Sequence, residues 1–263
     1  MNEAPTTEQA ARTIKATRVS LTILEELKTR DGATLSELAT DLSPSKSTLH
    51  CHLGTLLDEG YVIKENGEYV LSLKSLDLGG YACERKNGYK SGQENVDKLA
   101  RQTHQPVQFV VAENGWASYL YQKAERVHEV PTRVGFTTHL HCTAAGKAIL
   151  ANLSEETVRK IVAERGLPAY TDRTITTRDE LFDELESIRS DDIAFDVSER
   201  WDGIQCVAKP VRTADGEILG SISISAQREM VTEEQFKETY PAKLANSASV
   251  ISINASYESI YPD

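Results

Sequence analysis

Residues 34–71 read TLSELATDLSPSKSTLHCHLGTLLDEGYVIKENGEYVL, and this stretch decides the fold of the amino-terminal part of the chain. Thr34 and Glu37 form a capping box, in which each side chain binds the backbone amide of the other residue. The box predicts the start of a short helix that runs through Leu42. Ser43-Pro44 then breaks the chain, because proline lacks an amide hydrogen and clashes with a preceding helical turn, and a further helix begins there.

The end of the same stretch predicts a β-hairpin. Two apolar runs, residues 61–63 and 69–71, flank Asn66-Gly67, a pair that readily adopts the positive φ angles of a tight hairpin turn. Ahead of the stretch, apolar residues from about Arg18 onward recur on one helical face, and that helix ends at Asp31-Gly32. This order of helices, broken turn and hairpin predicts a winged helix-turn-helix, which is typical of DNA-binding proteins.

The third helix of this unit has an apolar face and a polar face. Leu49, Leu53 and Leu56 recur at helical spacing and are expected to pack on the other two helices. A recognition helix enters the major groove by its first turns, where free backbone amides and the helix dipole favour phosphate. We therefore predict double-stranded DNA as a partner, and the predicted contacts in this helix are Ser45, Lys46, Ser47, Thr48 and His50. The alternative is a winged-helix sensor whose helices pack against a protein partner.

The charge of the chain argues against a broad DNA-binding surface. The net charge is −11, and residues 1–80 contain 8 Lys and Arg against 12 Asp and Glu, a net charge of −4. DNA-binding proteins usually carry a basic surface, because lysine and arginine displace the counterions of the phosphates. The DNA-binding part must therefore use a few local cations and backbone amides. Acidity throughout suits a halophilic archaeal host, although many proteins of ordinary hosts are equally acidic.

The sequence predicts a cytoplasmic protein without a membrane partner. No apolar run approaches the roughly 18–20 residues that cross a bilayer. The first ten residues, MNEAPTTEQA, lack the basic-then-apolar order of a signal peptide. The four cysteines are widely spaced and form no CxxC pair, so we expect free thiols.

The rest of the chain predicts a connecting helix and a second domain. Residues from about 74 to 90 favour the connecting helix, with breaks at Asn87-Gly88 and Ser91-Gly92. After the connecting helix, the sequence predicts both helices and strands, and helices that flank a largely antiparallel sheet indicate an α+β fold. We expect helices at about 93–103, 143–152 and 154–165, one capped by Thr177 and Glu180, and a last one capped by Thr232 and Gln235, with strands near 107–112, 118–122, 127–133, 193–197, 205–211 and 217–225. The predicted domains are residues 10–73, 74–91 and 92–258.

Several short segments of the winged-helix stretch match a known family. They are LSELA, SKSTLH, TLL, GYV and YVL, at residues 35–39, 45–50, 55–57, 60–62 and 69–71. Together they resemble the IclR family of transcription regulators, and the similarity extends through Leu78-Gly79, where that family has a linker helix. Cys51 stands where the family commonly has arginine, and Gly54 stands where a basic or polar residue is usual. We expect other cations to compensate, together with dimeric avidity, and the candidates are Lys64 in the hairpin and Arg18, with Arg12 and Lys15.

The second domain continues the resemblance in residues 140–148, 193–196, 203–211 and 220–225. The resemblance implies a GAF-like effector-binding domain and assembly as a homodimer or tetramer. It also implies a regulator controlled by a small organic-acid or sugar-derived effector, in carbon catabolism. The family binds such effectors at the positions of Ala144, Ala145, Asp196, Cys206, Ser223 and Ser225.

The residue types at these positions allow more than one interpretation. Ala144, Ala145 and Gly146 begin a helix, where small side chains leave backbone amides open to a carboxylate or permit tight helix packing. Ser223 and Ser225 point the same way from a strand, so their hydroxyls either bind a ligand or face solvent.

A GAF-like thiol- or zinc-dependent enzyme is the rival hypothesis. His139, His141 and Cys142 lie close together in the sequence, and Cys206 could join them. Their spacing differs from that of common zinc sites, and no oriented base or oxyanion site is identifiable. The sequence also lacks a Gly-rich phosphate loop. We therefore predict no catalysis, no metal and no cofactor.

Overall fold

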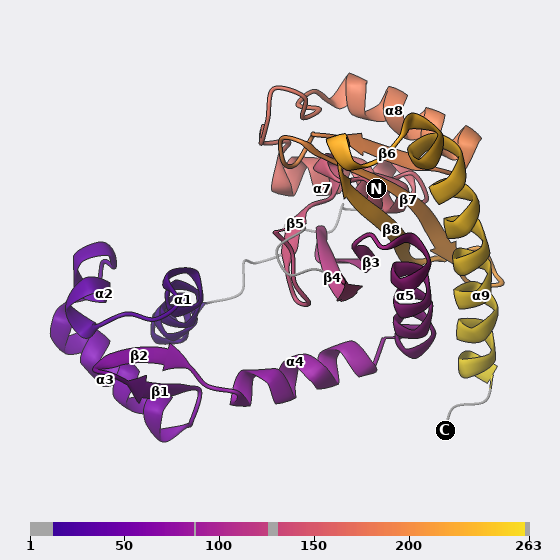
Figure 1. Ribbon diagram of the computed structural model, residues 1–263. Helices are drawn as coiled ribbons and strands as arrows, with labels where there is room; N and C mark the ends of the chain where they lie inside the picture. Colours follow the sequence, from indigo (N-terminus) through magenta and orange to yellow (C-terminus); the bar gives the residue numbers. More distant parts are fainter. Residues whose placement is uncertain (1–12, 87, 126–130, 261–263) are drawn as a thin grey trace, which may run out of the picture. The chain divides into compact units, whose positions relative to one another are not determined.

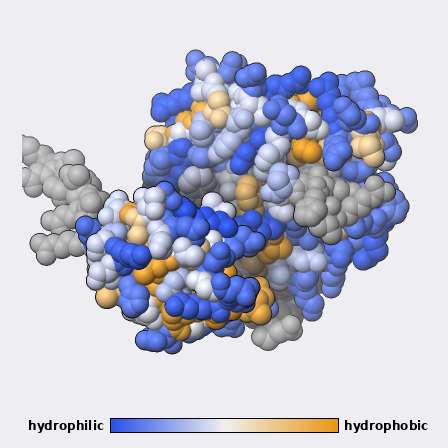
Figure 2. All heavy atoms as spheres, turned by 60° about the vertical axis from the view of Figure 1, so that its left-hand side comes forward, coloured by the Kyte–Doolittle hydropathy of each residue, from blue (hydrophilic) through white to orange (hydrophobic). Residues whose placement is uncertain are grey.

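Figure 1 shows a computed structural model of the chain, which describes residues 13–86, 88–125 and 131–260. The chain divides into two compact units, Met1–Tyr81 and Ala82–Asp263. Hydrophilic residues cover most of the surface seen in Figure 2. Among the described residues, no helix is both long enough and apolar enough to cross a membrane.

The first unit is the predicted winged helix-turn-helix. Its elements are α1 (Lys15–Arg30), α2 (Leu35–Asp41), α3 (Lys46–Asp58) and the antiparallel strands β1 (Val62–Glu65) and β2 (Glu68–Leu71). The capping box is present, because the Thr34 side chain accepts the Glu37 amide and the Glu37 carboxylate accepts the Thr34 amide. Asn66 and Gly67 take positive φ angles of 52° and 92° in the hairpin turn. The core is formed by Ile23, Leu27, Leu38, Leu49, Leu53 and Val62.

The second unit is built on a six-stranded antiparallel sheet. Its strand order is β5-β4-β3-β8-β7-β6. The strands are β3 (Val107–Glu113), β4 (Trp116–Lys123), β5 (Thr137–His139), β6 (Ala194–Val197), β7 (Ile204–Arg212) and β8 (Ile218–Gln227). The prediction of an α+β fold is therefore confirmed.

Helices cover both faces of this sheet. On one face α5 (Tyr89–Thr103) and α9 (Tyr240–Ile260) lie side by side (Figure 1). They pack on Phe109, Ile222 and Ile224. The other face packs against α6 (Ala144–Leu150), α7 (Glu155–Arg165) and α8 (Arg178–Asp191). Because side chains alternate along a strand, the polar residues between the isoleucines of β8 face α6.

Short helical segments connect these elements. α4 (Lys74–Glu84) follows the hairpin, and none of its side chains is buried. The short turn η1 (Leu140–Cys142) precedes α6, and the short turn η2 (Arg228–Met230) follows β8. The π-helix η3 (Gln235–Thr239) leads into α9. Thr232 and Gln235 exchange capping hydrogen bonds at the start of this last helical region, as predicted.

The predicted break at Ser91-Gly92 is wrong. α5 begins at Tyr89 and runs through both residues. Around the break expected at Asn87-Gly88, α4 ends at Glu84 and Gly88 precedes α5, while Asn87 itself lies outside the described residues. Gly92 is required by packing, because a Cβ there would lie 2.6 Å from the Phe109 ring. The glycine thus permits a close helix–sheet approach and does not end the helix.

Some predictions concern residues outside the described part of the chain. These are residues 10–12 at the start of the predicted DNA-binding domain, Arg12 among them, Asn87, and residues 126–130 of a predicted strand. The described residues 131–133 of that predicted strand are not in a strand. Instead, β5 pairs with β4, with Trp116 opposite His139. Three residues give too short an alternation to be recognised in a sequence.

Candidate functional sites

The exposed face of α3 carries the predicted recognition residues. Ser45 caps the helix, since its hydroxyl accepts the Thr48 amide at 3.2 Å. Leu49 and Leu53 are fully buried on the opposite face. The predicted contact residues of this helix are all exposed, namely Ser45, Lys46, Ser47, Thr48 and His50. The structure therefore leaves the first turns of α3 open to a partner.

The cations of this unit have defined neighbours. Lys46 donates from Nζ to Ser36 Oγ at 2.9 Å and ties the start of α3 to α2. The Lys64 ammonium lies 4.7 Å from the centroid of the Tyr69 ring, a cation–π contact that holds the cation over the hairpin. Arg18 is exposed. Each of these predicted phosphate contacts keeps its charge at the surface of the unit.

Arg18 also lines a groove of about 490 Å³ in the first unit. The groove runs between the start of α1 and the turn that joins α2 to α3. Its lining residues are Thr13, Lys15, Arg18, Val19, Thr22, Asp41, Leu42, Ser43 and Pro44. Two cations from α1 therefore flank the turn of the helix-turn-helix. The sequence analysis missed His52, whose Nδ1 lies 2.8 Å from Ser20 Oγ and links α3 to α1.

In the second unit, a row of buried polar side chains crosses four neighbouring strands, β6, β7, β8 and β3. The ladder register places Asp196 of β6 opposite Cys206 of β7, and Cys206 opposite Ser225 of β8. The Cys206 sulfur lies 3.1 Å from the Ser225 hydroxyl. Ser223 and Ser225 both donate to Oε1 of Gln108, at 3.0 and 3.1 Å. We call Asp196, Cys206, Ser225, Ser223 and Gln108 the polar row.

The start of α6 packs on this side of the sheet. Ala144 and Ala145 are buried in the same apolar cluster as Cys206. A Cβ on Gly146 would collide with the Leu140 carbonyl, and the Gly146 amide already donates to the Thr143 hydroxyl at 3.0 Å. The packing interpretation of these small residues is therefore supported at Gly146. The structure brings the predicted effector residues onto one side of the sheet and shows that the two serines do not face solvent.

A buried ionic cluster adjoins the polar row. Lys147 of α6 is 1% exposed and pairs with Glu184 at 2.7 Å and with Glu199 at 2.6 Å. Burial alone would lower the pKa of Lys147, but the two carboxylates raise it above its ordinary value, so the lysine stays charged. Oε2 of Glu199 is buried and has no hydrogen-bond partner among the described residues. Oδ1 of Asp196 accepts the Glu199 amide at 2.7 Å.

Asp196 titrates unlike an ordinary aspartate. Burial, followed by repulsion from Glu199, raises the pKa of Asp196 to about 7, against the opposing effect of backbone hydrogen bonds and Lys147. Burial also raises the pKa of Glu199, and Lys147 opposes that rise. The polar row therefore offers a carboxyl group that is protonated in a substantial fraction of molecules near neutral pH.

Comparison with known proteins decides the family. Residues 82–253 match the family described as "Bacterial transcriptional regulator IclR C-terminal", and residues 16–65 match the "IclR helix-turn-helix domain". This chain belongs to the IclR family. It is therefore a DNA-binding transcription regulator with an effector-binding domain, and the resemblance seen in the sequence is confirmed.

Relatives of this IclR-family chain match it over most of its length. The probable HTH-type transcriptional regulator ArcR of Halobacterium salinarum is 28% identical over 253 residues, which cover 92% of this chain and 94% of that protein. The HTH-type transcriptional regulator KdgR of Escherichia coli is 29% identical over 244 residues, covering 91% and 92%. The crystal structure of Thermotoga maritima IclR matches with a TM-score of 0.75 at 27% identity, over 92% of this chain and 98% of that one.

The thiols and imidazoles named in the rival hypothesis, Cys142, Cys206, His139 and His141, have defined surroundings. Burial raises the pKa of Cys142 to about 12 and raises that of Cys206, whereas a nucleophilic thiol needs a lowered pKa. Burial lowers the pKa of His141 to about 4, and its Nε2 lies 3.2 Å from the Pro168 carbonyl. His139 contacts the Tyr170 hydroxyl. Within the described ranges, no group of three or more His, Cys, Asp or Glu side chains is placed to hold a metal.

One residue of the polar row and one of the ionic cluster carried a signal in the sequence that was overlooked. Gln108 is the one polar residue in the run VQFVVA, and Lys147 is the one charged residue in AAGKAILA. A polar side chain inside an apolar run is informative, because burial without a partner is costly. The partners of Lys147 lie 37 and 52 residues away, so the sequence alone could not identify them.

Proposed function

We propose that this IclR-family regulator changes its affinity for an operator when a small organic acid binds beside the polar row, and that it controls genes of carbon catabolism. The observation that carries the proposal is the row itself, in which Asp196, Cys206, Ser223 and Ser225 are buried and share one side of the sheet. Buried hydroxyls are retained where they serve a hydrogen bond. Here both hydroxyls donate to Gln108, and each can rotate to donate to a ligand oxygen.

The hydrogen-bonding groups of the row favour an acid that carries its own hydroxyl or carbonyl group. A carboxylate is a good acceptor for the two serine hydroxyls. A second polar group on the ligand would then meet Asp196, which can donate a hydrogen bond when it is protonated. Sugar acids, 2-hydroxy acids and 2-oxo acids all have this arrangement, and such acids are intermediates of carbon metabolism.

The regulator is proposed to work as a homodimer or a higher oligomer. Leu76 and Tyr81 of α4 are 68% and 69% exposed, and Leu73 just before the helix is 84% exposed. Exposed apolar side chains gathered on one helix favour burial against a partner, and a second copy of the chain is the partner we propose. Two copies would present two recognition helices to a pseudo-palindromic operator.

Effector control then requires that the ligand bind two states of the dimer with different affinities. A ligand shifts DNA affinity only by this difference, which is typically about 1–3 kcal/mol. Ser45, Lys46, Ser47, Thr48, His50, Lys64 and Arg18 are the residues we propose to contact DNA. Their exposure supports this assignment.

Calorimetry with a panel of 2-hydroxy, 2-oxo, sugar and aromatic acids tests the effector site. We expect one class to bind, and Ser223→Ala and Asp196→Ala to lower its affinity by about tenfold or more. Ser187→Ala is the matched control, since Ser187 is exposed on α8 and donates its hydrogen bond to the backbone carbonyl of Asp183, away from the polar row. Unchanged affinity in both site variants would refute the assignment. Sedimentation of Leu76→Asp, which should shift the protein toward monomer, tests the dimer.

A further inference from the structure

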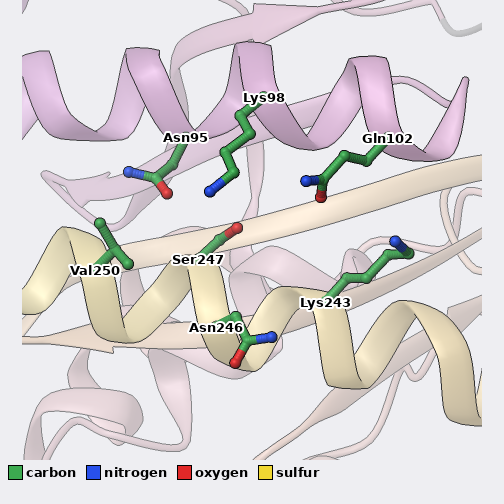
Figure 3. A pocket seen from close by; sticks show the side chains of 7 residues that line it. All are labelled: Asn95, Lys98, Gln102, Lys243, Asn246, Ser247 and Val250. Atoms are coloured by element: carbon green, nitrogen blue, oxygen red, sulfur yellow. The ribbon is translucent and has the colours of Figure 1, made fainter.

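A second cleft lies on the opposite side of the sheet, between α5 and α9. Its volume is about 250 Å³. The residues that line it are Asn95, Lys98, Gln102, Lys243, Asn246, Ser247 and Val250 (Figure 3). α5 and α9 pack on the face formed by Phe109 and Ile222, whereas the polar row faces α6. The cleft and the polar row are therefore separate places in the same unit.

The lining of this cleft is basic in an acidic protein. Lys98 and Lys243 come from the two facing helices, and no aspartate or glutamate of the described residues lines the cleft. Neither lysine has an ion-pair partner among the described residues. The chain as a whole has 40 Asp and Glu against 29 Lys and Arg, and most other lysines of this unit do pair, Lys86 and Lys237 among them. Two unpaired ammonium groups around one cleft attract an anion.

The buried wall of the cleft supplies hydrogen-bonding groups. Asn95 is 6% exposed and donates one amide hydrogen to the Ser91 carbonyl at 2.9 Å, which leaves the other free. Ser247 is 8% exposed, and its hydroxyl makes no hydrogen bond within the described part of the chain. Figure 3 shows Asn95 and Lys98 extending from α5 toward α9, and Ser247 extending back toward α5. This hydroxyl lines the cleft and has no partner among the described residues to compete with a ligand oxygen, to which it can donate or from which it can accept.

We propose that this cleft binds a small oxyanion carrying two negative charges, such as a phosphate group or a short dicarboxylate. Two ammonium groups neutralise two charges, and the amide of Asn95 and the hydroxyl of Ser247 bind oxygen atoms. Ligand pockets commonly measure about 300–1,000 Å³, so a cleft of about 250 Å³ fits a small ion or a small metabolite. Bound between α5 and α9, the anion would link the first helix of the unit to its last.

Calorimetric titrations with inorganic phosphate and with succinate, at constant ionic strength, test this site. Acetate serves as the singly charged comparison. We expect phosphate, succinate or both to bind once per chain, and acetate to bind at least about tenfold more weakly. Binding of phosphate alone would assign the site to phosphorylated ligands, and binding of succinate alone would assign it to dicarboxylates.

The variants separate a built site from general electrostatics. Lys98→Gln and Lys243→Gln should each weaken binding by about tenfold, and Ser247→Ala by about threefold. Lys90→Gln is the matched control, since Lys90 is exposed on α5 and does not line the cleft. Asp196→Ala should also leave anion binding unchanged, because Asp196 lies on the other side of the sheet.

Several results would overturn the proposal. They are no binding of either dianion at millimolar concentration, equal losses in Lys98→Gln and Lys90→Gln, or unchanged binding in both cleft variants. A change of sedimentation coefficient in Lys98→Gln without anion binding would instead identify the cleft as a contact between copies of the chain. Melting curves of each variant verify that it is folded.

Discussion

Replacing Gly54 by lysine tests which face of α3 meets DNA. Gly54 lies in α3, and outside its chain neighbours and the backbone of its own helix a Cβ there would meet no heavy atom of the described residues within 4 Å. A lysine at this position extends from the face that carries Ser47 and Cys51. Its ammonium therefore reaches DNA phosphates if this face lies in the major groove, and it reaches only solvent otherwise.

The expected size of the effect follows from the site. Replacing a helical glycine by lysine stabilises the helix by roughly 0.5–1 kcal/mol, because the backbone loses less freedom on folding. Each added phosphate contact steepens the slope of log K against log salt by about 0.9. In a dimer with one new contact in each half, this slope becomes steeper by about 1.8. A fourfold rise in salt concentration should therefore weaken the Gly54→Lys complex about 12-fold more than the wild-type complex.

The assay is fluorescence anisotropy with operator DNA at four or more salt concentrations. Gly54→Ala is the control, because it has the same helical advantage without the cation. We expect Gly54→Lys to bind more tightly at low salt and to show the steeper slope, while Gly54→Ala keeps the wild-type slope. If both variants melt at a higher temperature but share one slope, this face of α3 does not contact the phosphates, and the recognition surface has been assigned to the wrong residues.

Three further predictions concern the second unit. Because burial raises the pKa of Asp196 to about 7 from its ordinary 3.8, the folded state keeps a proton that the unfolded chain has released. The unfolding free energy should therefore fall as the pH rises from about 4 to 7, by up to about 1.4 kcal/mol per pH unit. In Asp196→Asn, the midpoint of urea unfolding should depend less on pH over that range. Lys147→Met leaves the buried carboxylate of Glu199 and the half-buried carboxylate of Glu184 without their cation. It should cost about 3–5 kcal/mol of unfolding free energy, part of which Glu199→Gln restores in the double variant; strictly additive losses would contradict the cluster. Gly92→Ala places a Cβ 2.6 Å from an aromatic ring and should lower the unfolding free energy by about 1–3 kcal/mol, and with it the melting temperature, despite better helix propensity. Gly79→Ala in α4, with open space around it, should raise both.

Local signals in the sequence predicted the first unit well. The capping box of Thr34 and Glu37 and the turn at Asn66-Gly67 involve residues that touch each other within one turn of chain, and both are present. Gly92 shows where such reasoning fails. A glycine inside a helix and a glycine that ends one look alike in a sequence, and only the approach of Phe109, a residue of another element, distinguishes them.

The residues of the candidate effector site could be predicted from the sequence, but the strand pairing and hydrogen bonds that join them could not. Resemblance to the family placed Asp196, Cys206 and both serines, and the ladder register brings them into one row. Gln108 joins that row because β8 pairs with β3 across a separation of more than a hundred residues. Strand order of this kind depends on the whole sheet, and no local pattern encodes it.

The acidity of the DNA-binding half has a consequence for how it selects DNA. The proposed contacts include only three cations in each copy: Lys46, Lys64 and Arg18. Lys46 also serves the contact with Ser36, and Lys64 also lies over Tyr69. A dimer would thus neutralise about six phosphates, which gives a salt slope near −5 and weak attraction to unspecific DNA. Because this sequence-independent electrostatic attraction is small, discrimination between DNA sequences has to come from groups that reach base edges. The exposed Ser47, Thr48 and His50 are the side chains that α3 offers for that purpose.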